Sequence, residues 1–63
     1  MFNIYKQKRD EGVIWRWNSR LSDRTEAESE AEWLADTERE HRFCVCDAET
    51  KEMLALCDKG GAK

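Results

Sequence analysis

The feature that most constrains the fold of this chain is a change of hydrophobic period between its ends and its middle. Short runs rich in β-branched and aromatic residues occupy both ends, whereas the middle repeats alanine and leucine at helical spacing. A chain of 63 residues has room for only one hydrophobic core. Residues 1–63 are therefore expected to form a single α+β domain.

Four strands are expected to flank the helix. The first pair is Phe2–Lys8 and Val13–Trp17 around an Asp10–Gly12 turn, and the second is Arg42–Cys46 and Met53–Cys57 around Asp47–Lys51. The order ββαββ predicts a four-stranded antiparallel sheet with one helix packed on one face. Residues 58–63 are expected to be a frayed tail.

The strand registers leave alternatives open. A three-residue loop over Asp10–Gly12 would pair Tyr5 with Trp17, whereas a two-residue turn would place Phe2, Ile4, Trp15 and Trp17 on one face. In the second hairpin, Phe43, Val45, Leu54 and Leu56 share one sheet face in any register in which the numbers of two paired residues add to an odd value. This bulky face is expected to meet the helix. One helix covers one sheet face, so the other face is expected to meet a partner or a second copy.

The helix is expected to start at Ser22 or Asp23, because Glu26 follows Asp23 at capping-box spacing. Its apolar stripe is narrow and consists of Ala27, Ala31, Leu34 and Ala35. Trp33 falls about 100° or more from this stripe, so it is expected at the helix flank, partly exposed.

Charge is distributed unevenly along the chain. Residues 1–22 contain five Lys or Arg and two acids, whereas residues 23–40 contain eight acids and two Arg, and the net charge is −3. A solvated helix face is the simplest interpretation of the acids. A rigid run of carboxylates can also imitate a phosphate backbone and occupy a basic groove.

Four side chains are potential zinc ligands: His41, Cys44, Cys46 and Cys57. A Cys-x-Cys pair on a strand places its sulfurs about 6–7 Å apart, which is unlike a zinc knuckle. The cysteines are therefore expected to be small buried hydrophobes, with no metal or cofactor. Nucleophilic catalysis is not expected either, because the only histidine lies in the acidic section.

No apolar run is long enough for a signal peptide or a membrane span, which predicts a cytoplasmic protein. In the first hairpin, Trp15-Arg16-Trp17 beside several cations would suit base stacking. The acidic balance, with a pI near 5.1, disfavours nucleic acid as a partner.

The pattern Phe2-x-Ile4-Tyr5-Lys6, followed by Gly12 and Trp15-Arg16-Trp17, resembles the opening hairpin of the YegP-like family of small proteins. The resemblance covers about the first 18 residues; it implies a β-hairpin followed by a helix and assigns no functional residue. In size and charge density the chain is also similar to small accessory proteins of bacteriophages.

These observations predict a small protein-binding module that is not an enzyme. Its sharper form is a phage-type inhibitor that acts in the host cytoplasm and whose acidic helix occupies the functional surface of a host protein. The expected contact residues are Trp33, Glu26, Glu30 and Asp36, with Trp15, Arg16 and Trp17 as a second patch. The alternatives are a single-stranded nucleic-acid-binding protein that uses the Trp-Arg-Trp hairpin and a zinc-stabilised mini-domain; a homodimer is compatible with each.

Overall fold

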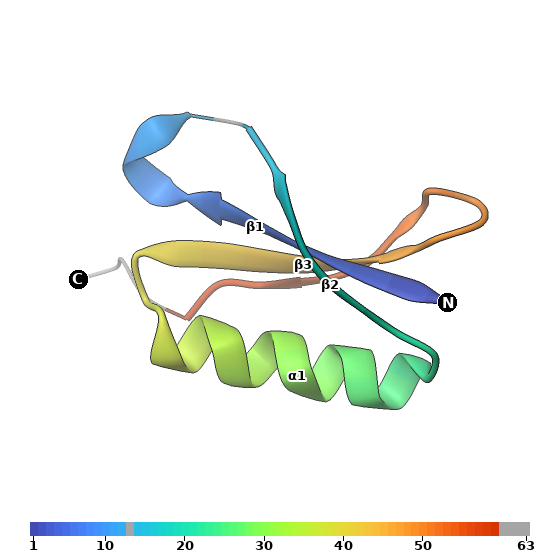
Figure 1. The fold of residues 1–63 in the computed structure, drawn as a ribbon. Coiled ribbons are helices and arrows are strands. Elements are labelled where there is room, and N and C mark those ends of the chain that lie inside the picture. Colours follow the sequence, from blue (N-terminus) through green and yellow to red (C-terminus); the bar gives the residue numbers. More distant parts are fainter. Residues whose placement is uncertain (13, 60–63) are drawn as a thin grey trace.

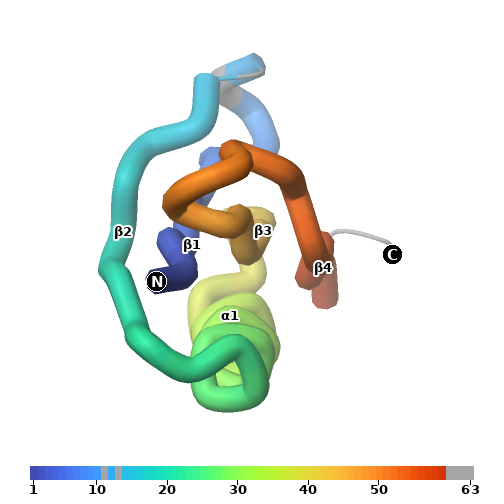
Figure 2. The backbone as a smooth tube through the Cα atoms, turned by 90° about the vertical axis from the view of Figure 1, so that its right-hand side faces the viewer, coloured from blue at the N-terminus to red at the C-terminus, as the bar shows by residue number. Residues whose placement is uncertain are grey.

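The computed structural model describes residues 1–12 and 14–59. Its elements are β1 (Phe2–Lys8), a 3-10 helix η1 (Arg9–Glu11), β2 (Arg16–Leu21), α1 (Arg24–Thr37), β3 (His41–Asp47) and β4 (Met53–Cys57). The strands pair antiparallel in the order β2-β1-β3-β4. Helix α1 lies on one side of this sheet (Figure 1), beneath the two central strands, with β2 and β4 at the edges (Figure 2). The predicted ββαββ fold is confirmed.

Hydrogen bonds to backbone N–H groups define both ends of helix α1. The side chain of Asp23, the N-cap, accepts a hydrogen bond from the backbone N–H of Glu26 at 3.0 Å. This contact satisfies one of the helix's unpaired N–H groups and selects Asp23 over Ser22 as the cap. At the other end, the backbone N–H of Glu38 donates to the carbonyl of Leu34 at 2.7 Å.

The hydrophobic core is small and lies between α1 and the sheet. Its largest fully buried side chains on this side are Phe43, Ile4 and Val45. They pack against the predicted stripe of Ala27, Ala31, Leu34 and Ala35, with Phe2, Leu21, Ala55 and Cys57 partly buried around them. Because alanine has almost no side chain, the helix axis can approach the sheet closely.

The first hairpin follows the expectation that pairs Tyr5 with Trp17, but its second strand is displaced. Strand β2 begins at Arg16 rather than at residue 13, which itself lies outside the described residues, and it runs on to Leu21. In the connection from β1 to β2, the Arg9 N–H donates to the carbonyl of Glu40 at 3.0 Å and Gly12 adopts a φ of 91°.

Next to the Tyr5–Trp17 pair, a β-bulge between Ile4 and Tyr5 shifts the register of β1 and β2. Phe2 and Ile4 therefore face the helix, whereas Trp17 lies on the opposite side of the sheet with Tyr5. The alternative that placed Phe2, Ile4 and both tryptophans on one face is wrong.

The register expected for the second hairpin is also wrong. Phe43 pairs with Cys57 and Val45 with Ala55, so the small residues of β4 face the helix. Leu56 pairs with Cys44 on the other face. The connecting turn sets this register: Asp47 Oδ1 accepts from the N–H groups of Glu49 and Thr50, and Lys51 takes a positive φ of 67°.

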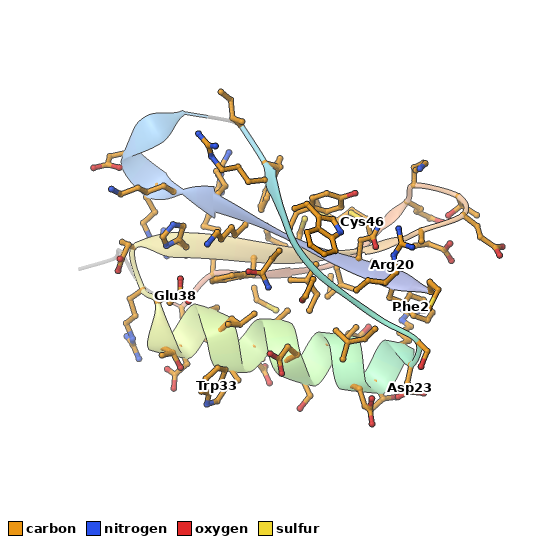
Figure 3. The ribbon with its side chains drawn as sticks, viewed as in Figure 1. Phe2, Arg20, Asp23, Trp33, Glu38 and Cys46 are labelled. Atoms are coloured by element: carbon orange, nitrogen blue, oxygen red, sulfur yellow. The ribbon has the colours of Figure 1, made fainter. Side chains whose placement is uncertain are left out.

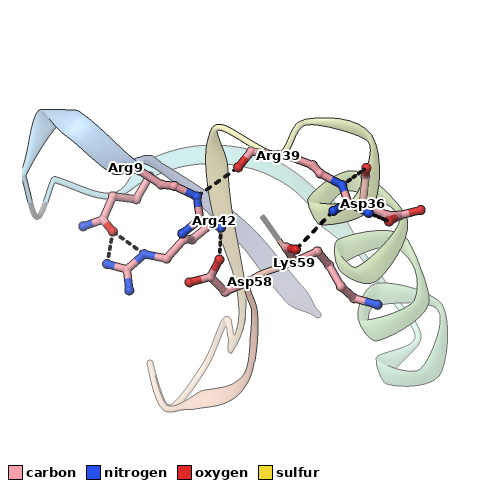
Figure 4. A network of polar contacts seen from close by, with 7 residues as sticks. Arg9, Asp36, Arg39, Arg42, Asp58 and Lys59 are labelled. Carbon is pink, nitrogen blue, oxygen red and sulfur yellow. Dashed lines mark hydrogen bonds and ion pairs between the residues drawn. The ribbon is translucent and has the colours of Figure 1, made fainter. Parts of the chain in front are cut away.

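Polar contacts join the ends of β1 and β4, which lie at the same end of the sheet, to the helix–strand connection (Figure 4). Arg9 forms an ion pair with Asp58 and donates from Nε to the carbonyl of Arg39 at 2.9 Å. Arg39 in turn donates to the carbonyl of Lys59 at 3.4 Å. The first two residues of the expected tail therefore contact the domain, and residues 60–63 lie outside the described residues.

Candidate binding surfaces

The sheet face that points away from α1 is the larger candidate surface, and we call it the open sheet face. Strand alternation and register define its members. They are Asn3, Tyr5 and Gln7 of β1, Trp17 and Arg20 of β2, Arg42, Cys44 and Cys46 of β3, and Met53 and Leu56 of β4. None of these residues is acidic.

Large apolar groups stand exposed on the open sheet face. Trp17 is 58 % exposed, Leu56 52 % and Met53 49 %. Tyr5 lies between Trp17 and Cys44 in the register of the three strands it joins. Aromatic, methionine and arginine side chains are the residues enriched at protein interfaces, so the composition of this face is that of an interface core.

Two arginines of the open sheet face are held by amides instead of carboxylates. Arg20 donates from Nε to Asn3 Oδ1 at 2.9 Å, and Arg42 donates from Nε to Gln7 Oε1 at 2.8 Å. Both amide side chains are almost fully buried, at 5 % and 2 % exposure. The amide oxygens orient the guanidinium groups but leave their positive charge uncompensated.

Three other arginines show the contrast. Arg9 pairs with Asp58, Arg24 with Glu28 at 2.9 Å, and Arg39 with Asp36 at 2.8 Å. Carboxylates neutralise those three cations within the chain. An anionic group of another molecule would therefore be attracted to Arg20 and Arg42, whose hydrogen-bond acceptors within the chain are neutral amides.

The structure separates the predicted Trp15, Arg16 and Trp17 patch. Arg16 pairs with Lys6, which places it on the helix side of the sheet, opposite to Trp17. The ring of Trp15 lies beside Arg42, with the guanidinium carbon 5.8 Å from the ring centroid. This cation–π contact makes Trp15 a neighbour of the open sheet face.

The second candidate surface is the side of α1 that points away from the sheet, and we call it the acidic helix surface. It consists of Glu26, Glu30, Trp33 and Asp36, the residues expected from the sequence to contact a partner, and their role in binding stays a prediction. Trp33 is 60 % exposed and projects away from the sheet (Figure 3). Within the described part of the chain, the ion pairs include neither Glu26 nor Glu30, and Asp36 forms its exposed pair with Arg39.

In the described residues, the charges of the first hairpin's strands and of the helix do not neutralise each other through ion pairs. The acids of α1 that form ion pairs bind Arg24, Arg39 and Lys59. In the described residues, no ion pair joins a cation of the first hairpin's strands to α1. The acids of α1 and the two arginines of the open sheet face therefore remain on opposite sides of the molecule.

The four potential zinc ligands do not converge. Cys44 and Cys46 lie on the open sheet face with their sulfurs 3.9 Å apart. His41 and Cys57 lie on the helix side of the sheet, near Phe43. Over residues 1–12 and 14–59, no group of three or more metal-ligating side chains forms.

The thiols of Cys44 and Cys57 are protected from ionisation. Burial raises the pKa of Cys44 to about 12, with a further contribution from Cys46. Burial and then Glu32 raise the pKa of Cys57. These thiols stay protonated at neutral pH, which is the opposite of what a nucleophilic cysteine requires, and the described residues form no pocket.

Several residues of the open sheet face were not among the predicted contacts: Asn3, Tyr5, Gln7, Arg20, Arg42, Met53 and Leu56. Alternation along each strand was visible in the sequence, for example at Asn3, Tyr5 and Gln7. The pairing that brings Gln7 to Arg42 was not visible, because it joins strands far apart in the chain.

Comparisons of the chain with protein-family models, curated proteins and solved structures found no match. The resemblance of the opening hairpin to YegP-like proteins stays a prediction. In the described residues, no helix has the length and apolar character needed to cross a bilayer.

Proposed function

We propose that this chain is a small, non-catalytic protein-binding module whose principal contact is the open sheet face. The supporting observation is the set of exposed apolar side chains on this face, with Trp17, Met53 and Leu56 about half exposed around two oriented arginines. A partner that covers it would bury apolar area and meet the uncompensated charge of Arg20 and Arg42. Trp and Arg are the residues that most often dominate binding energy at interfaces.

This proposal moves the principal contact away from the acidic helix. The acidic helix surface has a single large apolar residue, Trp33, whereas the open sheet face combines several with two arginines. A phage-type inhibitor in the host cytoplasm fits the proposal, since a protein this small would act by covering a functional surface of its target.

Two tryptophans give a matched test of the proposed surface. Trp17 and Trp33 are exposed to nearly the same extent, 58 % and 60 %, on opposite sides of the molecule. Immobilised wild-type protein, Trp17→Ala and Trp33→Ala are exposed to lysates of candidate hosts, and captured proteins are identified and then purified for affinity measurement.

We expect Trp17→Ala to weaken binding of the captured partner by tenfold or more and Trp33→Ala to leave it within about twofold, since a buried tryptophan anchor contributes 2 kcal/mol or more. The reverse pattern would make the acidic helix surface the contact. Equal affinity of all three proteins for the captured partner would contradict a contact through either surface. Far-UV circular dichroism checks that each variant is folded.

A second candidate function uses the same face for single-stranded nucleic acid. It is favoured by the amide-held Arg20 and Arg42 beside Trp17 and Tyr5, because aromatic rings stack bases while cations hold phosphates. Fluorescence anisotropy with a labelled oligothymidylate at low salt tests it. Binding that falls steeply with salt and disappears in R20E/R42E would replace protein binding as the proposal; no binding would exclude this candidate.

A further inference from the structure

We propose that the open sheet face also takes a second copy of this chain, which docks through its acidic helix surface, so that copies associate head to tail. This inference rests on the proposed function in using the same open sheet face. It goes beyond the proposed function by naming one partner, a second copy of this chain. The evidence is the complementarity of charge and spacing between the two surfaces of one chain.

The charges are opposite and available. Arg20 and Arg42 are oriented by the neutral side chains of Asn3 and Gln7, and no member of their face is acidic. On the acidic helix surface, Glu26 and Glu30 lie one turn apart and outside the ion pairs of the described residues. Contact between such surfaces would replace solvent-screened charges with direct ion pairs.

The spacing also matches. Asn3 and Gln7, which anchor the two arginines, are four residues apart on β1, or about 13 Å, with Tyr5 between them. Glu26 and Asp36 are ten residues apart on α1, or about 15 Å along its axis, with Trp33 between them. Each surface therefore has two charged ends with an aromatic ring between them, and the distance between the charged ends is nearly the same on both surfaces.

One internal contact competes with this docking, and it is weak. Asp36 pairs with Arg39 at 2.8 Å, but the side chains of both residues are about 60 % exposed. Exposed pairs of this kind contribute little free energy. Asp36 can therefore exchange Arg39 for an arginine of the next copy.

The placement of the surfaces sets the form of the assembly. Trp33 projects from α1 away from the sheet, whereas Arg20 pairs with Asn3 on the sheet's other side (Figure 3). A contact between two different surfaces is heterologous, and it produces open chains unless the rotation closes a ring. Association should therefore continue past the dimer as concentration rises.

Sedimentation equilibrium of the full chain tests the inference. We expect the weight-average mass at low salt to rise with concentration beyond that of a dimer. It should return to the monomer value at 1 M salt, where the Debye length is about 3 Å. A mass that equals the monomer at every concentration would overturn the inference and leave the Trp17 and Trp33 test of the proposed function unaffected.

Matched variants locate the contact. E26Q/E30Q removes two charges from the acidic helix surface, and E28Q/E32Q removes two charges from the acids of α1 that pair with Arg24 and Lys59. We expect at least tenfold weaker association for E26Q/E30Q and less than a twofold change for E28Q/E32Q. Equal effects of both pairs would indicate a general dependence on net charge and overturn the docking.

On the other surface, N3D/Q7E neutralises both guanidinium groups while retaining an oxygen acceptor for each. We expect it to weaken association as strongly as E26Q/E30Q. Should N3D/Q7E fail to fold, as judged by circular dichroism, R20Q/R42Q replaces it and the helix variants still decide the outcome.

Mixing experiments separate head-to-tail association from the other arrangements. R20Q/R42Q retains an intact helix surface and E26Q/E30Q retains an intact sheet face, so each should associate at least tenfold more weakly alone, whereas the mixture should form a discrete one-to-one complex. If R20Q/R42Q weakens association, E26Q/E30Q leaves it unchanged and the mixture forms no mixed complex, the contact is instead a symmetric dimer through the sheet faces. Co-sedimentation with nucleic acid that nuclease treatment abolishes would also contradict a second copy as the occupant.

Discussion

The guanidinium of Arg42 on β3 donates from Nε and from Nη2 to the side-chain oxygen of Gln7 on β1, with Nε and Oε1 2.8 Å apart. The two residues are opposite one another in the central strand pair of the sheet. One neutral, almost fully buried amide therefore orients a charged group on the open sheet face.

Gln7→Glu and Gln7→Leu should have different effects on stability. Glutamate keeps the acceptor and adds an opposite charge whose attraction to Arg42 offsets the cost of desolvating a carboxylate at this buried position, so the free energy of unfolding should change by less than about 1 kcal/mol. Leucine leaves the donors of Arg42 without their acceptor and should cost about 1–3 kcal/mol. Urea denaturation followed by circular dichroism measures both; equal midpoints for Gln7→Leu and wild type would show that water replaces the amide without cost.

Removal of the helix cap should destabilise the whole domain, because α1 covers its only core. Asp23→Ala removes the acceptor for the Glu26 N–H and should lower the free energy of unfolding by about 0.5–2 kcal/mol. Asp23→Asn retains an acceptor and should stay close to wild type. Ser22→Ala, one residue earlier, is the control, and a loss as large as that of Asp23→Ala would mean that the cap had been assigned to the wrong residue.

A substitution in the turn between β3 and β4 should stabilise the protein. Lys51 adopts a φ of 67°, which strains a residue with a long side chain, while its N–H donates to the carbonyl of Asp47 at 2.8 Å. Lys51→Asn keeps the N–H and tolerates this conformation, so we expect a gain of up to about 1 kcal/mol. Thermal unfolding of Lys51→Asn and of the same-turn control Glu49→Asn measures the difference; a lower midpoint for Lys51→Asn alone would contradict the strain.

Alkaline pH should destabilise the protein through Cys44. Burial raises the pKa of this thiol from 9.0 to about 12, so between these values the unfolded chain loses the proton while the folded chain retains it. The unfolded state then binds fewer protons, and the free energy of unfolding falls as pH rises above about 9. Cys44→Ala should flatten this fall in urea midpoint, and an unchanged pH dependence would exclude Cys44 as its source.

Much of the local structure could be predicted from the sequence. The strands Phe2–Lys8 and Met53–Cys57 have the predicted bounds, because aromatic and β-branched residues mark the first and a short run of apolar residues forms the second. Asp23 and the alanine stripe define α1 and its buried face, since capping and helical periodicity act within a few residues of the chain. Trp33 is exposed because that same periodicity places it away from the stripe.

The two candidate surfaces differ in how far the sequence could predict them. The acidic helix surface follows from helical spacing alone, so the exposure of Trp33 beside Glu26 and Glu30 could be predicted. The open sheet face depends on which residues lie opposite one another across three strand pairs. Two of those pairs contain a β-bulge, and one extra residue moves every side chain beyond it to the other face.

The sequence by itself determined the elements, their order and the separation of basic and acidic segments, because these follow from local composition and period. Only the tertiary structure decided that Arg16 turns toward the helix side, that Leu56 joins Cys44 and that Gln7 meets Arg42. Strand pairing is a contact between distant segments, and its register is fixed by turns and bulges that the hydrophobic pattern does not specify. The side chains that share the open sheet face are therefore a consequence of folding rather than of spacing along the chain.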